Sequence, residues 1–144
     1  MKSTKDEQGK LIKEIPLNYI GGKFWELTDD LKHVLHNGSE IIIPKGFKTD
    51  LSSTPKFLWG LLPPYGDFLL SAIVHDWLYV SDYQRKKIGS KRAREFADKE
   101  MYLIASELHD NKVDNWLRWK GVRLFGKGVY DRYSTQYSGK SEIE

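Results

Sequence analysis

A histidine and an aspartate stand side by side in one of the most apolar stretches of the 144-residue chain. His75 and Asp76 lie in the segment 68–80, FLLSAIVHDWLYV, where Ser71 is the only other polar residue before Tyr79. Because a buried ionisable group is costly without a partner, this pair needs either a structural partner or a chemical task. A histidine that a carboxylate orients can act as a general base, since its second ring nitrogen then accepts a proton.

Asp98 is the candidate carboxylate for His75. The sequence predicts a helix to about residue 80, and residues 91–108 repeat apolar positions with the period of an amphipathic helix. The short polar segment 81–89 predicts that the two helices are antiparallel neighbours. At about 1.5 Å per residue, His75 and Asp98 then lie roughly 7 and 12 Å from the shared loop. We therefore expect their side chains to meet, with Tyr79 one turn after His75 on the same face.

The elements around this pair predict an α+β fold. Residues 24–27 and 31–35 are strand-like, and Asn37-Gly38 is a strong hairpin signal before the return strand 40–43. A third helix is expected over about 113–124, ended by the glycines that follow. We predict a small antiparallel N-terminal hairpin sheet packed on about three α-helices. Residues 1–15 read as a mobile lead-in, 16–133 as one globular domain and 134–144 as a polar tail.

Composition excludes several classes of protein. The chain has no cysteine, which excludes disulfides and thiolate chemistry. Its net charge of +3 is no specific nucleic-acid signal. The N-terminus lacks the apolar core of a signal peptide, and no apolar run approaches the ~20 residues of a membrane helix. We expect synthesis in the cytoplasm without secretion by a signal peptide.

The polar segment 49–55 has two interpretations. Its Asp, Ser and Thr side chains can hold an irregular turn by bonding nearby amides. Alternatively the loop lines the His75 site, with Thr49, Ser52 and Ser53 along it and Asp50 supplying oxygen ligands to a metal. A triad of Ser52 or Ser53 with His75 and the distant aspartate is a further alternative, although no nucleophile elbow is present.

Two more features of the sequence can be interpreted either as functional or as purely structural. Six cations lie within residues 85–94: Arg85, Lys86, Lys87, Lys91, Arg92 and Arg94. They form either a solvated face or a surface for phosphate headgroups, nucleic acid or an acidic virion. Trp116 and Trp119 stand one helical turn apart, a spacing more typical of core positions than of a ligand stack.

The pattern His-Asp-x-x-Tyr on one helix with Ala-Asp on the next resembles phospholipase A2. This resemblance covers about 35 residues and lacks that family's cysteines and glycine-rich calcium loop. It implies that His75 is the general base, that Asp98 orients it, and that Tyr79 lies near Asp98. It also implies that Asp76 binds Ca²⁺, the one cofactor that the chain would need.

A longer resemblance covers residues 24–133. IPKGFKTDLSSTP (43–55), PPYG (63–66), HDWLY (75–79), Ala97-Asp98 and WKGVRLFG (119–126) are similar to a phage and prophage protein family of unknown function. This resemblance implies a phage origin and supplies no activity.

Two main hypotheses follow. The first is a phage-encoded hydrolase that acts on an ester in lipid or host envelope material through His-activated water and Ca²⁺. The second is a non-catalytic phage protein, in the virion or bound to virion or host proteins, in which the His-Asp pair is structural. A metal-dependent phosphohydrolase of the other His-Asp kind is a third alternative, but it needs further helical ligands, and His33 and His36 fall in the predicted hairpin.

Overall fold

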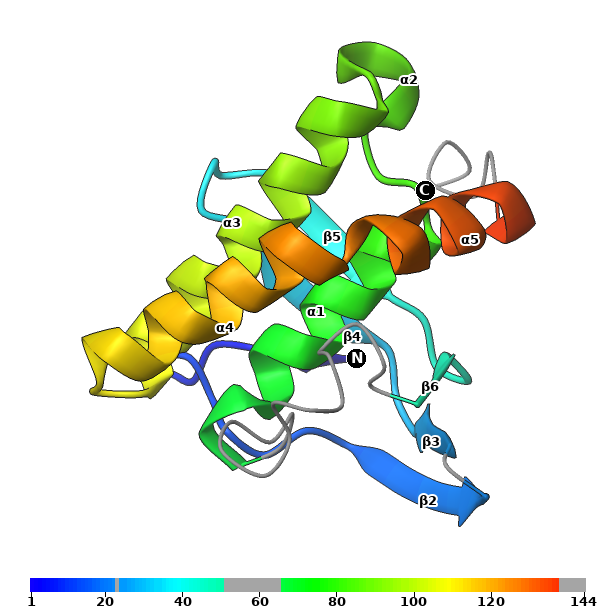
Figure 1. The fold of residues 1–144 in the computed structure, drawn as a ribbon. Helices are drawn as coiled ribbons and strands as arrows, with labels where there is room; N and C mark the ends of the chain where they lie inside the picture. Colours follow the sequence, from blue (N-terminus) through cyan, green and yellow to red (C-terminus); the bar gives the residue numbers. More distant parts are fainter. Residues whose placement is uncertain (23, 51–65, 138–144) are drawn as a thin grey trace.

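The computed structural model describes residues 1–22, 24–50 and 66–137, which form the predicted α+β fold (Figure 1). The strands are β1 (Lys2–Ser3), β2 (Leu17–Gly21), β3 (Phe24–Leu27), β4 (Leu31–Val34), β5 (Glu40–Ile43) and β6 (Lys48–Thr49). The helices are α1 (Leu69–Val80), α2 (Arg85–Ile88), α3 (Ser90–Leu108), α4 (Lys112–Phe125) and α5 (Lys127–Tyr137), with a 3₁₀ turn, η2 (Gly66–Phe68), before α1. In this part of the chain, no helix has the length and apolarity to cross a membrane.

Helix α1 lies at the centre of the molecule. In Figure 1, α4 and α5 cross in front of α1, while β4 and β5 lie behind it. Every residue from Leu70 to Val80 is buried, as expected for a helix that is apolar on all sides. Phe68 packs with Ala105, and Tyr83 packs on Phe96, so α3 runs antiparallel to α1 as predicted.

The predicted hairpin is present as β4 and β5. Leu31 pairs with Ile43 and His33 with Ile41, and Gly38 in the turn has φ of +92°, a conformation that glycine adopts without strain. The described strands form two three-stranded sheets, with orders β1-β4-β5 and β2-β3-β6, where the sequence predicted one hairpin sheet. Strand β1 pairs in parallel with β4.

The polar residues 1–15, expected to be a mobile lead-in, have partners in the structure. Lys2 pairs with Leu31, and buried Thr4 has its Oγ1 2.9 Å from Nδ1 of His33. A two-residue strand is too short for hydrophobic alternation to reveal. The division into a lead-in, one domain and a polar tail stays a prediction.

The three predicted helices end close to the expected residues, but the structure contains more helices than expected. The described residues contain α2 and α5 in addition to the three predicted helices. Gly126 is the C-cap of α4, so this helix ends at the predicted glycine, but a further helix, α5, begins directly after it at Lys127. The N-caps of α1 and α3 are Phe68 and Gly89, and neither cap makes a side-chain hydrogen bond.

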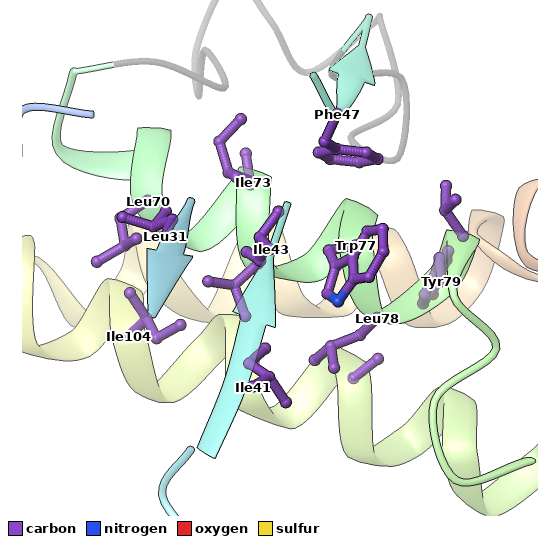
Figure 2. Packing of buried hydrophobic residues seen from close by; sticks show 14 of the residues in the cluster. Leu31, Ile41, Ile43, Phe47, Leu70, Ile73, Trp77, Leu78, Tyr79 and Ile104 are labelled. Carbon is purple, nitrogen blue, oxygen red and sulfur yellow. The ribbon is translucent and has the colours of Figure 1, made fainter. Parts of the chain in front are cut away.

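The main core joins the β4–β5 hairpin to α1 and α3. Figure 2 shows Leu31, Ile41 and Ile43 among the side chains of α1, with Ile104 from α3 at the same layer. Strand β5 alternates: Ile41 and Ile43 are 5% and 0% exposed, whereas Ile42 is 43% exposed. This alternation is the sheet period expected for one buried face.

The alternation predicts losses of stability of unequal size for two identical substitutions in β5. Ile43→Ala should destabilise the protein by about 2–5 kcal/mol, because it leaves a cavity in the core. Ile42→Ala, the matched control at a neighbouring exposed position, should cost less than about 1 kcal/mol. Urea unfolding of both variants measures the difference, and equal losses would show that this strand register is wrong.

Candidate functional site

Asp98 brings α1 and α3 together at the predicted site. Nε2 of His75 lies 2.6 Å from Asp98 Oδ1, and the Tyr79 hydroxyl donates to the same oxygen at 2.5 Å. All three side chains are fully buried. The contact expected from the helix depths is therefore present, and Tyr79 joins it from the next turn of α1.

The second oxygen of Asp98 contacts two arginines that the sequence did not single out for this site. Nη1 of Arg123 in α4 donates to Asp98 Oδ2 at 2.6 Å, and Nη1 of Arg94 lies 3.5 Å from it. Arg94 also donates to the carbonyls of Val122 and Arg123, at 3.1 and 3.2 Å. The i, i+4 spacing of Arg94 and Asp98 is a sequence signal that could have indicated the Arg94 contact.

These contacts keep the Asp98 carboxylate ionised. Burial alone raises the pKa of this carboxyl, but hydrogen bonds from His75, Tyr79 and Arg123 outweigh burial and leave the pKa below its ordinary value. Burial and the negative charge of Asp98 raise the pKa of Tyr79 well above its ordinary value. Tyr79 therefore keeps its proton and acts as a donor to Asp98.

The network fixes which nitrogen of His75 carries the proton. An ionised carboxylate only accepts hydrogen bonds, so Nε2 of a neutral His75 carries the hydrogen and Nδ1 has the lone pair. The position of the hydrogen is assigned from the distances between non-hydrogen atoms in this network. Nδ1 is buried, and the structure gives it no hydrogen-bond partner across residues 1–22, 24–50 and 66–137. A buried acceptor of this kind can take a proton from a small donor such as water.

Gly126 makes room for Tyr79. A Cβ at residue 126 would lie 2.9 Å from the Tyr79 hydroxyl and 2.4 Å from the Val122 carbonyl oxygen. The ring of Tyr130 packs edge-on against Tyr79 with centroids 4.9 Å apart. The short distance between residue 126 and the Tyr79 hydroxyl, which donates to Asp98, therefore requires glycine here.

Asp76, the candidate calcium ligand, lies in a different environment. The hydroxyl of Thr49 donates to Asp76 Oδ2, so the start of the polar loop lies beside α1 as expected. Arg118 from α4 is buried and stacks on Phe68, with its guanidinium carbon 4.7 Å from the ring centroid. Burial lowers the pKa of Arg118 to about 10, against the opposing effect of the Asp76 charge.

The other predicted ligands are only partly described. Asp50 is half-buried and directly follows Thr49, while Ser52 and Ser53 lie outside the described residues. Within the described part of the chain, no group of three or more His, Asp or Glu side chains is arranged to hold a metal ion. Calcium binding by Asp76 and Asp50 stays a prediction.

A second buried cluster joins the β4–β5 hairpin to α3. Glu100 Oε2 lies 3.0 Å from Nε2 of His33 and 2.8 Å from Nδ1 of His36, and Oε1 accepts the His36 amide at 3.0 Å. Burial raises the pKa of Glu100, but its bonds with His33 and His36 outweigh burial and lower it. Burial lowers the pKa of His36, but bonds with Glu100 and Glu107 outweigh burial and raise it.

Fold and site together define an α+β protein built around a buried His-Asp pair. A family model described as a protein of unknown function (DUF1353) matches residues 25–122. The chain belongs to this family, DUF1353, which confirms the predicted membership of a family of unknown function. No curated protein and no solved structure matches the chain. Phage origin and the likeness to phospholipase A2 stay predictions.

The space around Gly126 predicts different effects for two Gly→Ala substitutions. Gly126→Ala should cost about 1–3 kcal/mol, because the new methyl group displaces Tyr79 or the Val122 carbonyl. Gly128→Ala is the matched control, since a Cβ there meets nothing within 4 Å. It should be neutral or stabilise α5 by up to about 1 kcal/mol. Chemical denaturation measures both, and a neutral Gly126→Ala would contradict this role.

The Glu100 cluster predicts a window of pH in which it contributes to stability. The lowered pKa of Glu100 gives a contribution that is present above 4.5 and is lost as pH falls through the folded-state value. The raised pKa of His36 gives a contribution that is full below 6.5 and is lost as pH rises through the folded-state value. The destabilisation by Glu100→Gln should therefore be largest between about pH 4.5 and 6.5.

Urea unfolding from pH 4 to 8 measures this window. Glu107→Gln is the matched control, because Glu107 contacts His36 from a position whose side chain is 49% exposed. We expect a smaller effect of this control at every pH. A destabilisation by Glu100→Gln that does not vary with pH would contradict the assignment.

Proposed function

We propose that this chain is a hydrolase in which His75 activates a water molecule. The observation that carries the proposal is Nδ1 of His75, a buried acceptor whose ring is held by Asp98 through Nε2 at 2.6 Å. Buried polar atoms are nearly always hydrogen-bonded, and exceptions are typical of catalytic groups and of sites for bound water. The His-Asp-Tyr contacts also agree with those implied by the resemblance to phospholipase A2.

The proposed reaction is hydrolysis of an ester. Nδ1 of His75 takes a proton from water while the water oxygen bonds to the ester carbonyl carbon. The ester C–O bond then breaks, and the leaving alkoxide takes the proton back from Nδ1. Asp98 stays ionised throughout and stabilises the imidazolium that forms between the two steps. Tyr79 is a positioning residue, because its hydroxyl contacts Asp98 and holds the carboxylate in place.

Calcium and substrate are finer parts of the same proposal. Asp76 would bind Ca²⁺ with help from Asp50, and the ester would belong to lipid or host envelope material of a phage-infected cell. A cation at Asp76 has to share this carboxylate with the Thr49 hydroxyl and with the charge of nearby Arg118. We therefore expect weak calcium affinity, no tighter than about 10⁻⁴ M.

A second candidate function is a non-catalytic role in a phage virion or at a host protein. The observation that favours it is the complete burial of His75 and Asp98, each 0% exposed. In that case the pair stabilises the junction of α1, α3 and α4 and carries no reaction.

Substitution of His75 separates the two candidates. His75→Asn keeps a donor toward Asp98 but cannot accept a proton from water, so ester hydrolysis should fall about 10²–10⁴-fold. The fold should lose only about 1–3 kcal/mol for the altered buried bond. His109→Asn is the matched control, because His109 likewise has carboxylate partners, Asp67 and Asp114, but lies at the end of α3, away from Asp98.

The measurements are hydrolysis of a panel of carboxylic esters and thermal melting with and without Ca²⁺. The hydrolase proposal expects activity in the wild type and in His109→Asn, and its loss in His75→Asn. Absence of hydrolysis by the wild type across the panel, together with strong destabilisation by His75→Asn, would favour the structural role. A melting temperature that Ca²⁺ does not change would remove calcium from the proposal.

A further inference from the structure

A partly open cavity that the proposed hydrolase site does not use lies between helices α3 and α4. It has a volume of about 560 Å³ and is lined by Glu95, Lys99 and Tyr102 of α3 and by Trp116, Trp119 and Arg123 of α4. On both helices these positions follow the three- and four-residue spacing of one face, so the cavity is a groove along the two helices. Its volume is within the range of small-molecule sites.

The aromatic side chains of this groove do not behave as the core residues that their spacing predicted. Trp116 is 49% exposed, and Trp119 packs edge-on against Tyr102 with ring centroids 6.3 Å apart. The result is a partly open aromatic surface on which a flat ring can stack.

A second, basic cavity continues the groove toward the start of α3. It has a volume of about 270 Å³, and its lining includes Lys91 and Arg94 of α3 and Lys127 of α5. Arg123 lines both cavities, so it marks the place where the aromatic and basic parts meet. From Lys91 to Tyr102 the groove extends about 16 Å along α3.

The basic side chains at the start of α3 lie where the helix dipole disfavours positive charge. Lys91, Arg92 and Arg94 occupy the start of α3, where the helix macrodipole is positive and favours acidic side chains. The acidic groups nearby are Asp131, which pairs with Lys127 at 2.6 Å, Glu95, whose carboxylate lies 3.9 Å from Nη2 of Arg123, and Asp98, which is fully buried. The basic cavity itself is lined by four cations, Lys91, Arg94, Arg123 and Lys127, and by Asp131 as its one acidic side chain among the described residues. Positive charge therefore remains at the surface of the basic cavity, where an anion can neutralise it.

We propose that this groove binds a nucleotide, with its base on Trp116 and Trp119 and its phosphate in the basic cavity beside Arg123. Stacking on aromatic side chains next to a basic track is the physical pattern by which proteins hold bases and phosphates without reading sequence. The same chemistry belongs to a free mononucleotide and to a nucleotide within a single strand. A simple anion would use only the basic cavity, and an apolar ligand only the aromatic one.

Arg123 connects this groove to the buried pair. Its Nη1 holds Asp98 Oδ2 at 2.6 Å, while Nε2 of His75 contacts the other carboxylate oxygen. A phosphate at Arg123 changes the charge next to Asp98, so the ring resonances of His75 should shift when the nucleotide binds.

The test is titration of the full chain with four probes, followed by tryptophan fluorescence and calorimetry. The probes are adenosine monophosphate, adenosine, inorganic phosphate and a short single-stranded oligothymidylate. We expect adenosine monophosphate or the oligonucleotide to bind at least about tenfold more tightly than adenosine or phosphate alone, because only the first two fill both cavities. Tighter binding of the mononucleotide identifies a free ligand, and tighter binding of the oligonucleotide identifies a strand; either outcome supports the proposal.

Matched variants assign the binding to the groove. Trp116→Ala should weaken nucleotide binding at least about fivefold, in line with the measured contribution of base stacking. Trp25→Ala, at a tryptophan of β3 that is 38% exposed, should leave binding unchanged. Lys91→Gln should weaken binding and reduce its salt dependence, whereas Lys45→Gln, in the turn after β5, should do neither.

Three results would overturn the proposal. These are equal affinity for phosphate and for both nucleotide probes, binding that Trp116→Ala leaves unchanged, and failure of all four probes to bind. Binding of anionic phospholipid vesicles through Trp116 with no nucleotide binding would likewise replace it with a lipid surface. None of these measurements uses ester hydrolysis, so their outcome tests nucleotide binding independently of the proposed reaction of His75.

Discussion

The buried charge of Asp98 is the constraint on which the arrangement of the helices depends. Its carboxylate is 0% exposed and receives donors from α1, from α4 and from its own helix α3. Removing a carboxylate from water costs several kcal/mol, and the cost is offset only when its partners are held in good geometry. The donors on α1 and α4 must therefore reach the same point on α3, which fixes how these three helices pack.

Helix α3 holds two layers of the fold together, because it carries a second buried carboxylate, Glu100, two residues after Asp98. Asp98 and Glu100 are about 200° apart around the helix axis, so they point to opposite sides. Asp98 faces α1 and α4, while Glu100 contacts His33 and His36 of the β4–β5 hairpin. The polar contacts of α3 thus join the helical layer and the sheet layer, and the apolar contacts of Ile104 fill the space between them.

The features predicted from the sequence are the ones that local periodicity controls. The contact of His75 with Asp98 followed from helix period and loop length, and the hairpin followed from Asn37-Gly38. The features that were missed join segments distant in sequence, such as Arg123 with Asp98 or β1 with β4. Periodicity also assigned Trp116 to the core, but only one face of α4 packs on α3, so this ring remains half exposed. No local pattern indicates that Arg123, 25 residues from Asp98 in the sequence, will meet this buried carboxylate.

The two carboxylate oxygens of Asp98 have different partners. One oxygen contacts buried side chains and the other contacts a partly exposed arginine, so Asp98 connects the interior of the protein with its surface. Oδ1 contacts His75 and Tyr79, whose side chains are fully buried. Oδ2 contacts Arg123, whose side chain is 21% exposed and lines both surface cavities. The attraction between charges is strong where little water screens them, so a change in charge at Arg123 reaches His75 through one carboxylate. Such coupling requires no movement of the backbone, because the atoms involved are already within hydrogen-bond distance.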